Sequence, residues 1–180
     1  SKWTPGEVKN PTYELPKEPA KTYVALVDRS ASVQSVINIS YPVDLKPGTP
    51  DAIKARVTNQ ILGGGFSARL MQNLREKHGY TYGASSSLST DILVGNFNAS
   101  ASVRNEVTDS AVFEFLSELK RIVNEPVTEQ ELIAAKAEIS GAFGRSLENP
   151  STIAGFALNT ARYNLPKDYY NNYVKAIDAV

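Results

Sequence analysis

Histidine and cysteine, the residue types that most often bind a catalytic zinc, are almost absent from this sequence. His78 is its only histidine, and it contains no cysteine. A catalytic zinc usually takes three protein ligands in which histidine dominates and cysteine or carboxylate completes the set. One imidazole without a thiolate does not provide that set, so we expect no metal site in this chain. His78 falls at the charged end of an expected helix, where a cation interacts favourably with the helix dipole.

Two other segments contain residue types that occur in active sites: the triplet Gly63, Gly64 and Gly65, and the serines at 85–87. The triplet is not followed by the Lys and Ser/Thr of a P-loop, so a phosphate cradle is not indicated. The serines have no histidine or acid at a spacing suited to activating a nucleophile. We interpret the triplet as a turn between two helices, in which glycine supplies positive φ angles. The serines are expected on the polar face of a strand.

The composition is that of one ordinary globular domain. Of the 180 residues, 42% are hydrophobic and 21% charged. The charges of the 19 basic and 19 acidic residues sum to a formal net charge of zero. This argues against nucleic-acid binding, which needs clustered positive charge. No apolar stretch approaches the roughly 18 residues of a membrane span, and residues 1–6 lack a signal-peptide pattern. Residues 1–20, with four prolines, indicate an extended linker, followed by a single domain over 21–180.

Alternating and β-branched patterns predict an antiparallel sheet. Residues 22–27 and 33–40 are rich in β-branched and apolar residues, which predicts a hairpin or two adjacent strands. Residues 80–88 and 94–103 predict a second pair of strands. In the last of these strands, alternate apolar residues share one face. They are Phe97, Ala99, Ala101 and Val103.

A first helix is expected to begin after Thr49. Thr49 is a good N-cap, and Pro50 suits the first helical position. Apolar residues then recur at intervals of four: Ile53, Val57 and Ile61. The glycine triplet at 63–65 is expected to end this helix.

A second helix is expected directly after the triplet. Ser67 is its expected N-cap, and Phe66 before it would pack on Met71 as a hydrophobic staple. Gly79 is placed to end this helix as a left-handed cap.

Helical periodicity dominates the rest of the chain. An apolar stripe runs through residues 112–123, and Thr128 with Glu131 forms the capping box of a further helix. Shorter helices are expected over 151–163 and 167–179. Strands, a helix pair, strands and then a run of helices predict an α+β fold, in which helices cover one face of an antiparallel sheet.

One long segment closely resembles a known family. Residues 61–87 read ILGGGFSARLMQNLREKHGYTYGASSS. They resemble the glycine-rich loop, the Ser-x-Arg-Leu helix and the Arg-Glu-Lys-x-Gly-x-x-Tyr run in the second domain of pitrilysin-type zinc peptidases, the family of insulinase and the mitochondrial processing peptidase. Matching stretches at 33–35, 125–128, 147–149 and 165–169 extend the resemblance over nearly the whole chain after the linker.

The resemblance implies a division of labour between two half-domains of the same fold. One half carries an inverted zinc motif, His-x-x-Glu-His, and its partner half carries no metal. The two halves close around an unfolded peptide. This sequence has no such motif, so it resembles the partner half. The zinc is then expected in a partner half, on the same or a second chain, within a zinc metalloendopeptidase, and this chain alone would be inactive.

Matched residue by residue, Arg75 and Tyr82 correspond to the Arg and Tyr that reach across the cleft in the bacterial members and their relatives. Peptide hydrolysis builds negative charge on the carbonyl oxygen, and donors aimed at that position lower the barrier. A guanidinium and a phenol can both donate without an altered pKa. Taken without the motif, Arg75 would be a solvated cation at a helix end and Tyr82 a strand residue packing on the core.

The resemblance also implies that Gly63, Gly64, Gly65 and Phe66 form a flexible substrate-binding loop at the cleft. Arg69 is expected to make a structural ion pair, with a cleft-facing role as the alternative.

Two other functions stay open. Relatives of this fold serve as inactive core subunits in a respiratory complex, so this chain is alternatively a structural or interaction subunit. A free-standing module that binds peptide at a sheet edge is a further alternative. Family domains continue after a position like Val180, so the chain is expected to be truncated there. The expected compartment is the bacterial periplasm or cytoplasm, with the periplasm favoured.

Overall fold

The computed structural model describes residues 6–7, 12–14, 16–28 and 30–180. Along the chain, the elements are β1 (Gln34–Val43), α1 (Pro50–Asn59), the π-helical η1 (Gln60–Gly64), α2 (Arg69–Met71), the π-helical η2 (Gln72–Lys77), β2 (Thr81–Ser89), β3 (Gly95–Arg104), the 3₁₀ turn η3 (Asn105–Val107), α3 (Thr108–Asn124), α4 (Glu129–Ser146), α5 (Pro150–Arg162) and α6 (Tyr173–Asp178).

The three strands form one antiparallel sheet in the order β1-β3-β2, with β3 in the centre. The register pairs Ile37 of β1 with Ala101 of β3, and Ser85 of β2 with Ser100 of β3. The strands predicted over 33–40, 80–88 and 94–103 are therefore confirmed, together with their antiparallel pairing.

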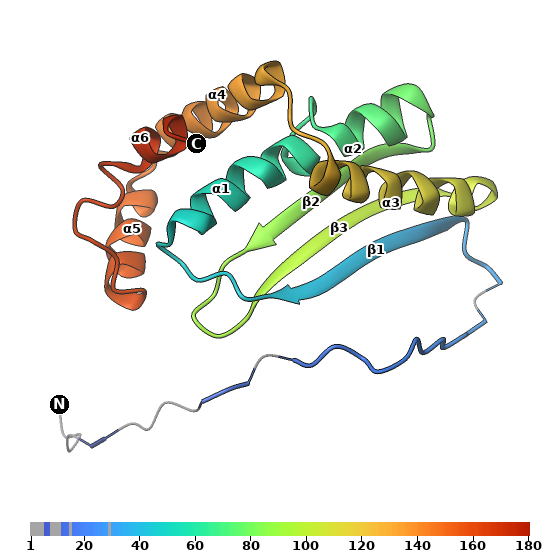
Figure 1. The fold of residues 1–180 in the computed structure, drawn as a ribbon, viewed down its shortest axis with the longest axis horizontal. Coiled ribbons are helices and arrows are strands. Elements are labelled where there is room, and N and C mark those ends of the chain that lie inside the picture. The colour runs from blue at the N-terminus through green and yellow to red at the C-terminus, as the bar shows by residue number, and fades with distance from the viewer. Residues whose placement is uncertain (1–5, 8–11, 15, 29) are drawn as a thin grey trace.

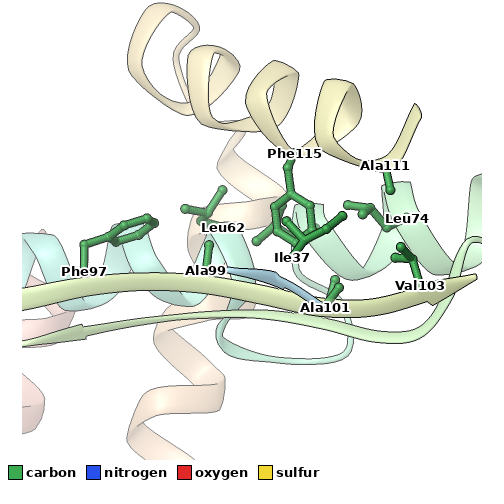
Figure 2. Packing of buried hydrophobic residues seen from close by; sticks show 11 residues of the cluster. Ile37, Leu62, Leu74, Phe97, Ala99, Ala101, Val103, Ala111 and Phe115 are labelled. Carbon is green, nitrogen blue, oxygen red and sulfur yellow. The ribbon is translucent and has the colours of Figure 1, made fainter. Parts of the chain in front are cut away.

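The helices cover one face of this sheet and enclose the main core there. In Figure 1, α3 crosses above β1 and β3, while α1 and α2 lie over β2. The inward residues of β3 are buried, as the alternating pattern predicted: Phe97, Ala99, Ala101 and Val103. Ala111 and Phe115 of α3 point onto them (Figure 2) and are fully buried. The predicted α+β fold with helices on one face is confirmed.

A second cluster of buried residues joins α1, α4 and α6 beyond the sheet. Its buried members are Ile53, Val57, Ile61, Ala135, Ile139, Tyr173 and Ile177. The predicted caps position these helices. Thr49 accepts a hydrogen bond from the amide of Ala52 at the start of α1, and Thr128 with Glu131 forms a complete capping box at the start of α4. The caps determine where α1 and α4 begin, and the buried residues of the cluster pack α4 against α1 and η1.

The hairpin predicted for residues 22–27 is wrong. Residues 22–28 form no strand, and their large side chains face solvent, with Leu26 and Val27 about nine-tenths exposed (91% and 90%). This segment follows an extended path apart from the sheet (Figure 1). Strand propensity reflects packing on a pleated, half-buried surface rather than an intrinsic backbone preference, and no such surface covers this segment. Arg29, within the predicted turn, lies outside the described residues.

Both ends of the chain also differ in part from expectation. Of the predicted linker 1–20, residues 1–5, 8–11 and 15 lie outside the described residues, and the remainder is exposed without helix or strand. The helix predicted over 167–179 is shortened to α6, because residues 167–172 form successive turns. None of the described helices combines the length and hydropathy that a bilayer-crossing helix requires.

Candidate functional site

The helix that carries Arg75 ends in a well-formed C-cap. Gly79 adopts φ +62°, which glycine reaches without steric cost. Its amide donates to the carbonyl of Arg75, and the amide of Tyr80 donates to the carbonyl of Leu74, both at 2.9 Å. These two bonds close the helix end and send the chain directly into β2. The predicted left-handed cap is confirmed, and it fixes the short connection between Arg75 and Tyr82.

The guanidinium of Arg75 lies over the ring of Phe66, with its central carbon 4.9 Å from the ring centroid. The Arg75 side chain is 39% exposed, and its Nε lies 3.4 Å from an oxygen of the adjacent Glu76. Phe66 itself is 58% exposed, so its ring is not buried as a hydrophobic staple would be. The structure thus brings together two of the predicted site residues, one predicted as catalytic and one as substrate-binding.

Tyr82 lies at an irregularity in β2, where the pairing register with β3 shifts between Thr81 and Ala84. Strand alternation from the buried Ala84 and Ser86 would place Tyr82 on the covered face, yet its side chain is 91% exposed. The hydroxyl of Thr81 accepts a hydrogen bond from the amide of Gly83 at 3.1 Å, which pins this irregularity. A core-packing role for Tyr82 is therefore excluded. Irregularities of this kind re-aim side chains.

Close contacts, rather than positive φ angles, surround the glycine triplet. Gly63 has φ −161° and Gly65 has φ −156°, both negative, so the expectation of positive φ was wrong. An added Cβ would instead lie 2.4 Å from the Ser86 amide nitrogen at Gly63, and 2.7 Å from a Glu138 oxygen at Gly65. Gly63 is buried against β2, whereas Gly64 is exposed. The loop is therefore buried at its first glycine and exposed at Gly64 and Phe66.

Ser67 does not cap the second helix. The N-cap is Ala68, whose side chain cannot accept a hydrogen bond, and the Ser67 hydroxyl donates to Glu138 of α4 at 2.9 Å instead. A carboxylate is a stronger acceptor partner than a neutral group, so the hydroxyl is drawn to α4. The two π-helical segments η1 and η2 flank this short helix.

Arg69 makes the structural ion pair that its position predicted. Its Nε and Nη2 donate to the two carboxylate oxygens of Glu131, at 2.6 and 2.9 Å. The Arg69 side chain is only 5% exposed, so its cleft-facing alternative is excluded. The hydrogen bond from Arg69, with those from Thr128, lowers the pKa of Glu131 to about 2. Glu131 therefore links α2 to the capping box of α4.

We expect Glu131→Gln to lower the free energy of unfolding by about 2 kcal/mol at pH 7, because it leaves the buried guanidinium of Arg69 without its charge partner. The value is set below that of a fully buried pair because Glu131 is 26% exposed. The folded-state pKa is depressed, so this stabilisation is present above the ordinary value of 4.5 and is lost as the pH falls towards 2.

Urea unfolding at pH 7, 4 and 3 measures this effect. The difference between the parent chain and Glu131→Gln should shrink as the pH falls. Glu129→Gln, also in the first turn of α4, is the matched control. Equal unfolding free energies for the two variants at pH 7 would refute the role of Glu131.

His78 packs among neighbours that suit a structural role. Its ring stacks on Tyr80 with centroids 4.9 Å apart, and its Nε2 lies 3.6 Å from a Glu114 oxygen. Across the described parts of the chain, no group of three His, Cys, Asp or Glu residues lies close enough to hold a metal ion. The residues present do not fit a zinc site.

The site residues predicted from sequence form one connected group and one outlier. Phe66, Arg75 and the triplet share a loop and the helix after it. Tyr82 lies on β2, and within the described residues no hydrogen bond joins it to Arg75. Sequence reasoning missed Glu138 and Thr81, which hold the loop and the Tyr82 irregularity. No local sequence pattern identifies these two residues, because Glu138 has the pattern of an exposed helix position and Thr81 that of an ordinary strand residue.

Comparison with known proteins places these observations in a family. A family model described as the Peptidase M16 inactive domain matches residues 1–139. A Rickettsia felis protein with the name "Uncharacterized zinc protease" is 37% identical over 79 residues, which are 44% of this chain and 19% of that protein.

Solved structures with a similar fold include an inactive domain of the same family. The crystal structure of a peptidase M16 inactive domain from Pseudomonas fluorescens is similar with a TM-score of 0.76 and 28% identity, over 83% of this chain and 35% of that chain. A protease from Helicobacter pylori has a TM-score of 0.75 at 19% identity, over 87% of this chain and 37% of that chain, which shows the fold alone. This chain spans only a part of each of these proteins.

Proposed function

Because this chain belongs to the Peptidase M16 inactive domain family, we propose that it forms the non-zinc side of a peptide-binding cleft in a zinc peptidase. A zinc-bearing half, on the same chain or a second one, lies opposite. Arg75 and Tyr82 assist hydrolysis of the bound peptide from this side. We also propose that residues 21–180 form this half-domain and residues 1–20 the linker before it.

The observation that carries this proposal is the contrast between two arginines on neighbouring turns. Arg69 is buried, and its Nε and Nη2 both donate to Glu131, while its Nη1 is buried without a hydrogen-bond partner. The Arg75 side chain is 39% exposed, and its one ion pair among the described residues is the 3.4 Å contact with Glu76. A guanidinium has five N–H donors, so Arg75 retains donors for a ligand. Arg69 is only 5% exposed, so burial keeps its guanidinium from a ligand.

Tyr82 supports the same proposal. Its side chain is 91% exposed at the edge strand β2, which makes its hydroxyl accessible to a second molecule. A large aromatic side chain gains free energy by burial, and this one is exposed. Binding of a peptide and closure of an opposite half-domain would cover it.

The chemistry assigned to these residues is electrostatic. When a peptide bond is attacked, negative charge develops on its carbonyl oxygen, and positioned donors stabilise that charge. The guanidinium N–H groups of Arg75 and the hydroxyl of Tyr82 are such donors. In this proposal neither residue transfers a proton. The glycine loop, through Gly64, Gly65 and Phe66, would contact the peptide beside them, and Gly63 would set the path of the loop against β2.

The first expected result concerns the chain by itself. After dialysis it should contain no stoichiometric zinc and cleave no peptide, because its described residues do not form a metal-binding group and it has a single histidine. Elemental analysis and a quenched fluorescent peptide measure both properties. One tightly held zinc per chain would overturn the assignment to the non-zinc half.

The alternative is an inactive structural subunit. The complete zinc-bearing protein separates the two functions, since a peptidase binds an unfolded peptide after its metal has been removed and hydrolyses it when zinc is restored. Protein that assembles normally with a zinc-bearing half, yet neither binds nor hydrolyses unfolded peptides, would favour the structural function.

A further inference from the structure

One carboxylate on α4 contacts the chain on both sides of the three glycines; the glycine loop is defined here as residues 63–67. One oxygen of Glu138 accepts a hydrogen bond from Gln60 Nε2, before the loop, at 2.6 Å. Its other oxygen accepts from the hydroxyl of Ser67, the last loop residue, at 2.9 Å. Hydrogen bonds to an ionised acceptor are roughly twice as strong as neutral ones. Glu138 therefore joins Gln60, which precedes the loop, and Ser67, its last residue, to a helix that is distant in sequence.

The glycines allow this carboxylate to come close. An added Cβ would lie 2.7 Å from a Glu138 oxygen at Gly65, and 2.5 Å from Gln60 Oε1 at Gly64. A side chain at either position would displace the pair that Gln60 and Glu138 form above the loop. Two of the three glycines are thus explained by the side chains that close over them.

The loop in turn determines where Phe66 lies. Its carbonyl accepts a hydrogen bond from Gln72 Nε2 at 3.0 Å, and its ring lies beneath the guanidinium of Arg75. A cation–π contact at an exposed site is weak. The ring orients Arg75 only if the backbone of the loop is held in place by other contacts.

We propose that Glu138 is a positioning residue that fastens the glycine loop to α4 and thereby keeps Phe66 under Arg75. It touches neither the peptide nor the reacting atoms. Its effect on catalysis rests on the proposed function of Arg75, whereas its effect on the loop does not. The two effects are measured separately for that reason.

The test uses the complete zinc-bearing protein. Glu138→Ala removes both hydrogen bonds, and Ser67→Ala removes one of them while the bond to Gln60 stays. Glu148→Gln is the matched control, because among the described residues the side chain of Glu148 makes no hydrogen bond or ion pair. Hydrogen exchange of the amides in the glycine loop reports loop opening, and steady-state kinetics report kcat and KM.

For Glu138→Ala we expect loop amides to exchange about tenfold faster or more, as the loss of hydrogen bonds to a charged group implies, and kcat to fall about tenfold with an unchanged melting temperature. Ser67→Ala should give a smaller change of the same kind. Glu148→Gln should resemble the parent in both measurements.

The outcomes separate this proposal from the proposed function. Unchanged loop exchange in Glu138→Ala overturns the fastening of the loop. Faster exchange with parental kcat, while Arg75→Lys does reduce kcat, overturns the positioning of Arg75. Faster exchange with parental kcat in both variants supports the fastening of the loop and counts against the proposed role of Arg75. Faster exchange with reduced kcat in both supports the whole proposal.

Discussion

Changing Tyr82 to Phe or Arg75 to Lys in the complete zinc-bearing protein is expected to lower kcat roughly a hundredfold to a thousandfold, the typical effect of losing one preorganised donor to an oxyanion. Tyr82→Phe removes only the hydroxyl. Arg75→Lys keeps the charge but loses the planar fork. Because both donors act on charge that develops in the transition state, KM should change much less than kcat.

Matched controls are available within the chain. Tyr23 is 84% exposed, which makes Tyr23→Phe a fair control for Tyr82→Phe. Arg162 lies over the ring of Tyr163 at 5.2 Å, much as Arg75 lies over Phe66, so Arg162→Lys controls for the loss of a stacked guanidinium. Thermal unfolding of each variant checks that the fold is retained.

The kinetic pattern decides the role of the two residues. A raised KM with parental kcat would mean that Arg75 and Tyr82 bind the peptide equally in ground and transition states. Parental kcat and KM in well-folded variants would mean that neither residue takes part, and the site assignment would then be wrong.

Gly63→Ala should destabilise the chain by about 3 kcal/mol, at the upper end of what overpacking typically costs. The new Cβ would lie 2.4 Å from the amide nitrogen of Ser86 and 2.9 Å from the carbonyl carbon of Ser85. Both are backbone atoms of β2, which is paired with the central strand, so neither can move aside without disturbing the sheet. The side chain of Ser86 is also tied to Asn59 by a hydrogen bond of 2.9 Å.

Two further glycine substitutions make this prediction specific. At Gly144, inside α4, an added Cβ meets nothing within 4 Å, so Gly144→Ala should stabilise the chain by up to about 1 kcal/mol through helix propensity. At Gly64 the near atoms belong to the flexible end of Gln60, so Gly64→Ala should cost less than Gly63→Ala. Urea unfolding ranks the three variants. A Gly63→Ala chain as stable as the parent would show that η1 does not pack on β2 as described.

Local sequence patterns predicted much of the fold. The N-cap at Thr49, the capping box of Thr128 with Glu131, and the left-handed cap at Gly79 each involve residues at most six apart, so the sequence alone specified them. Alternation along 94–103 likewise determined which face of β3 is buried. The expectation that this chain binds no zinc rests on composition, because the sequence contains one histidine and no cysteine.

Tertiary structure decided what these signals could not. Residues 22–27 have the composition of a strand. A strand forms only where it pairs with another strand or packs on other residues, and residues 22–27 are exposed and form no strand. Tyr82 follows the alternation of a buried position, yet the shift in pairing between Thr81 and Ala84 leaves it exposed.

The candidate site shows the same division. The sequence by itself determined which residues occupy the motif, including Arg75, Tyr82 and the glycine triplet. Only the folded chain brought Glu138 onto the loop, through hydrogen bonds that span 78 and 71 residues. Such contacts depend on how α4 packs over η1, and they leave no periodic or compositional trace in either segment. The tertiary structure therefore decided which atoms surround the glycines, and which of two nearby arginines is buried.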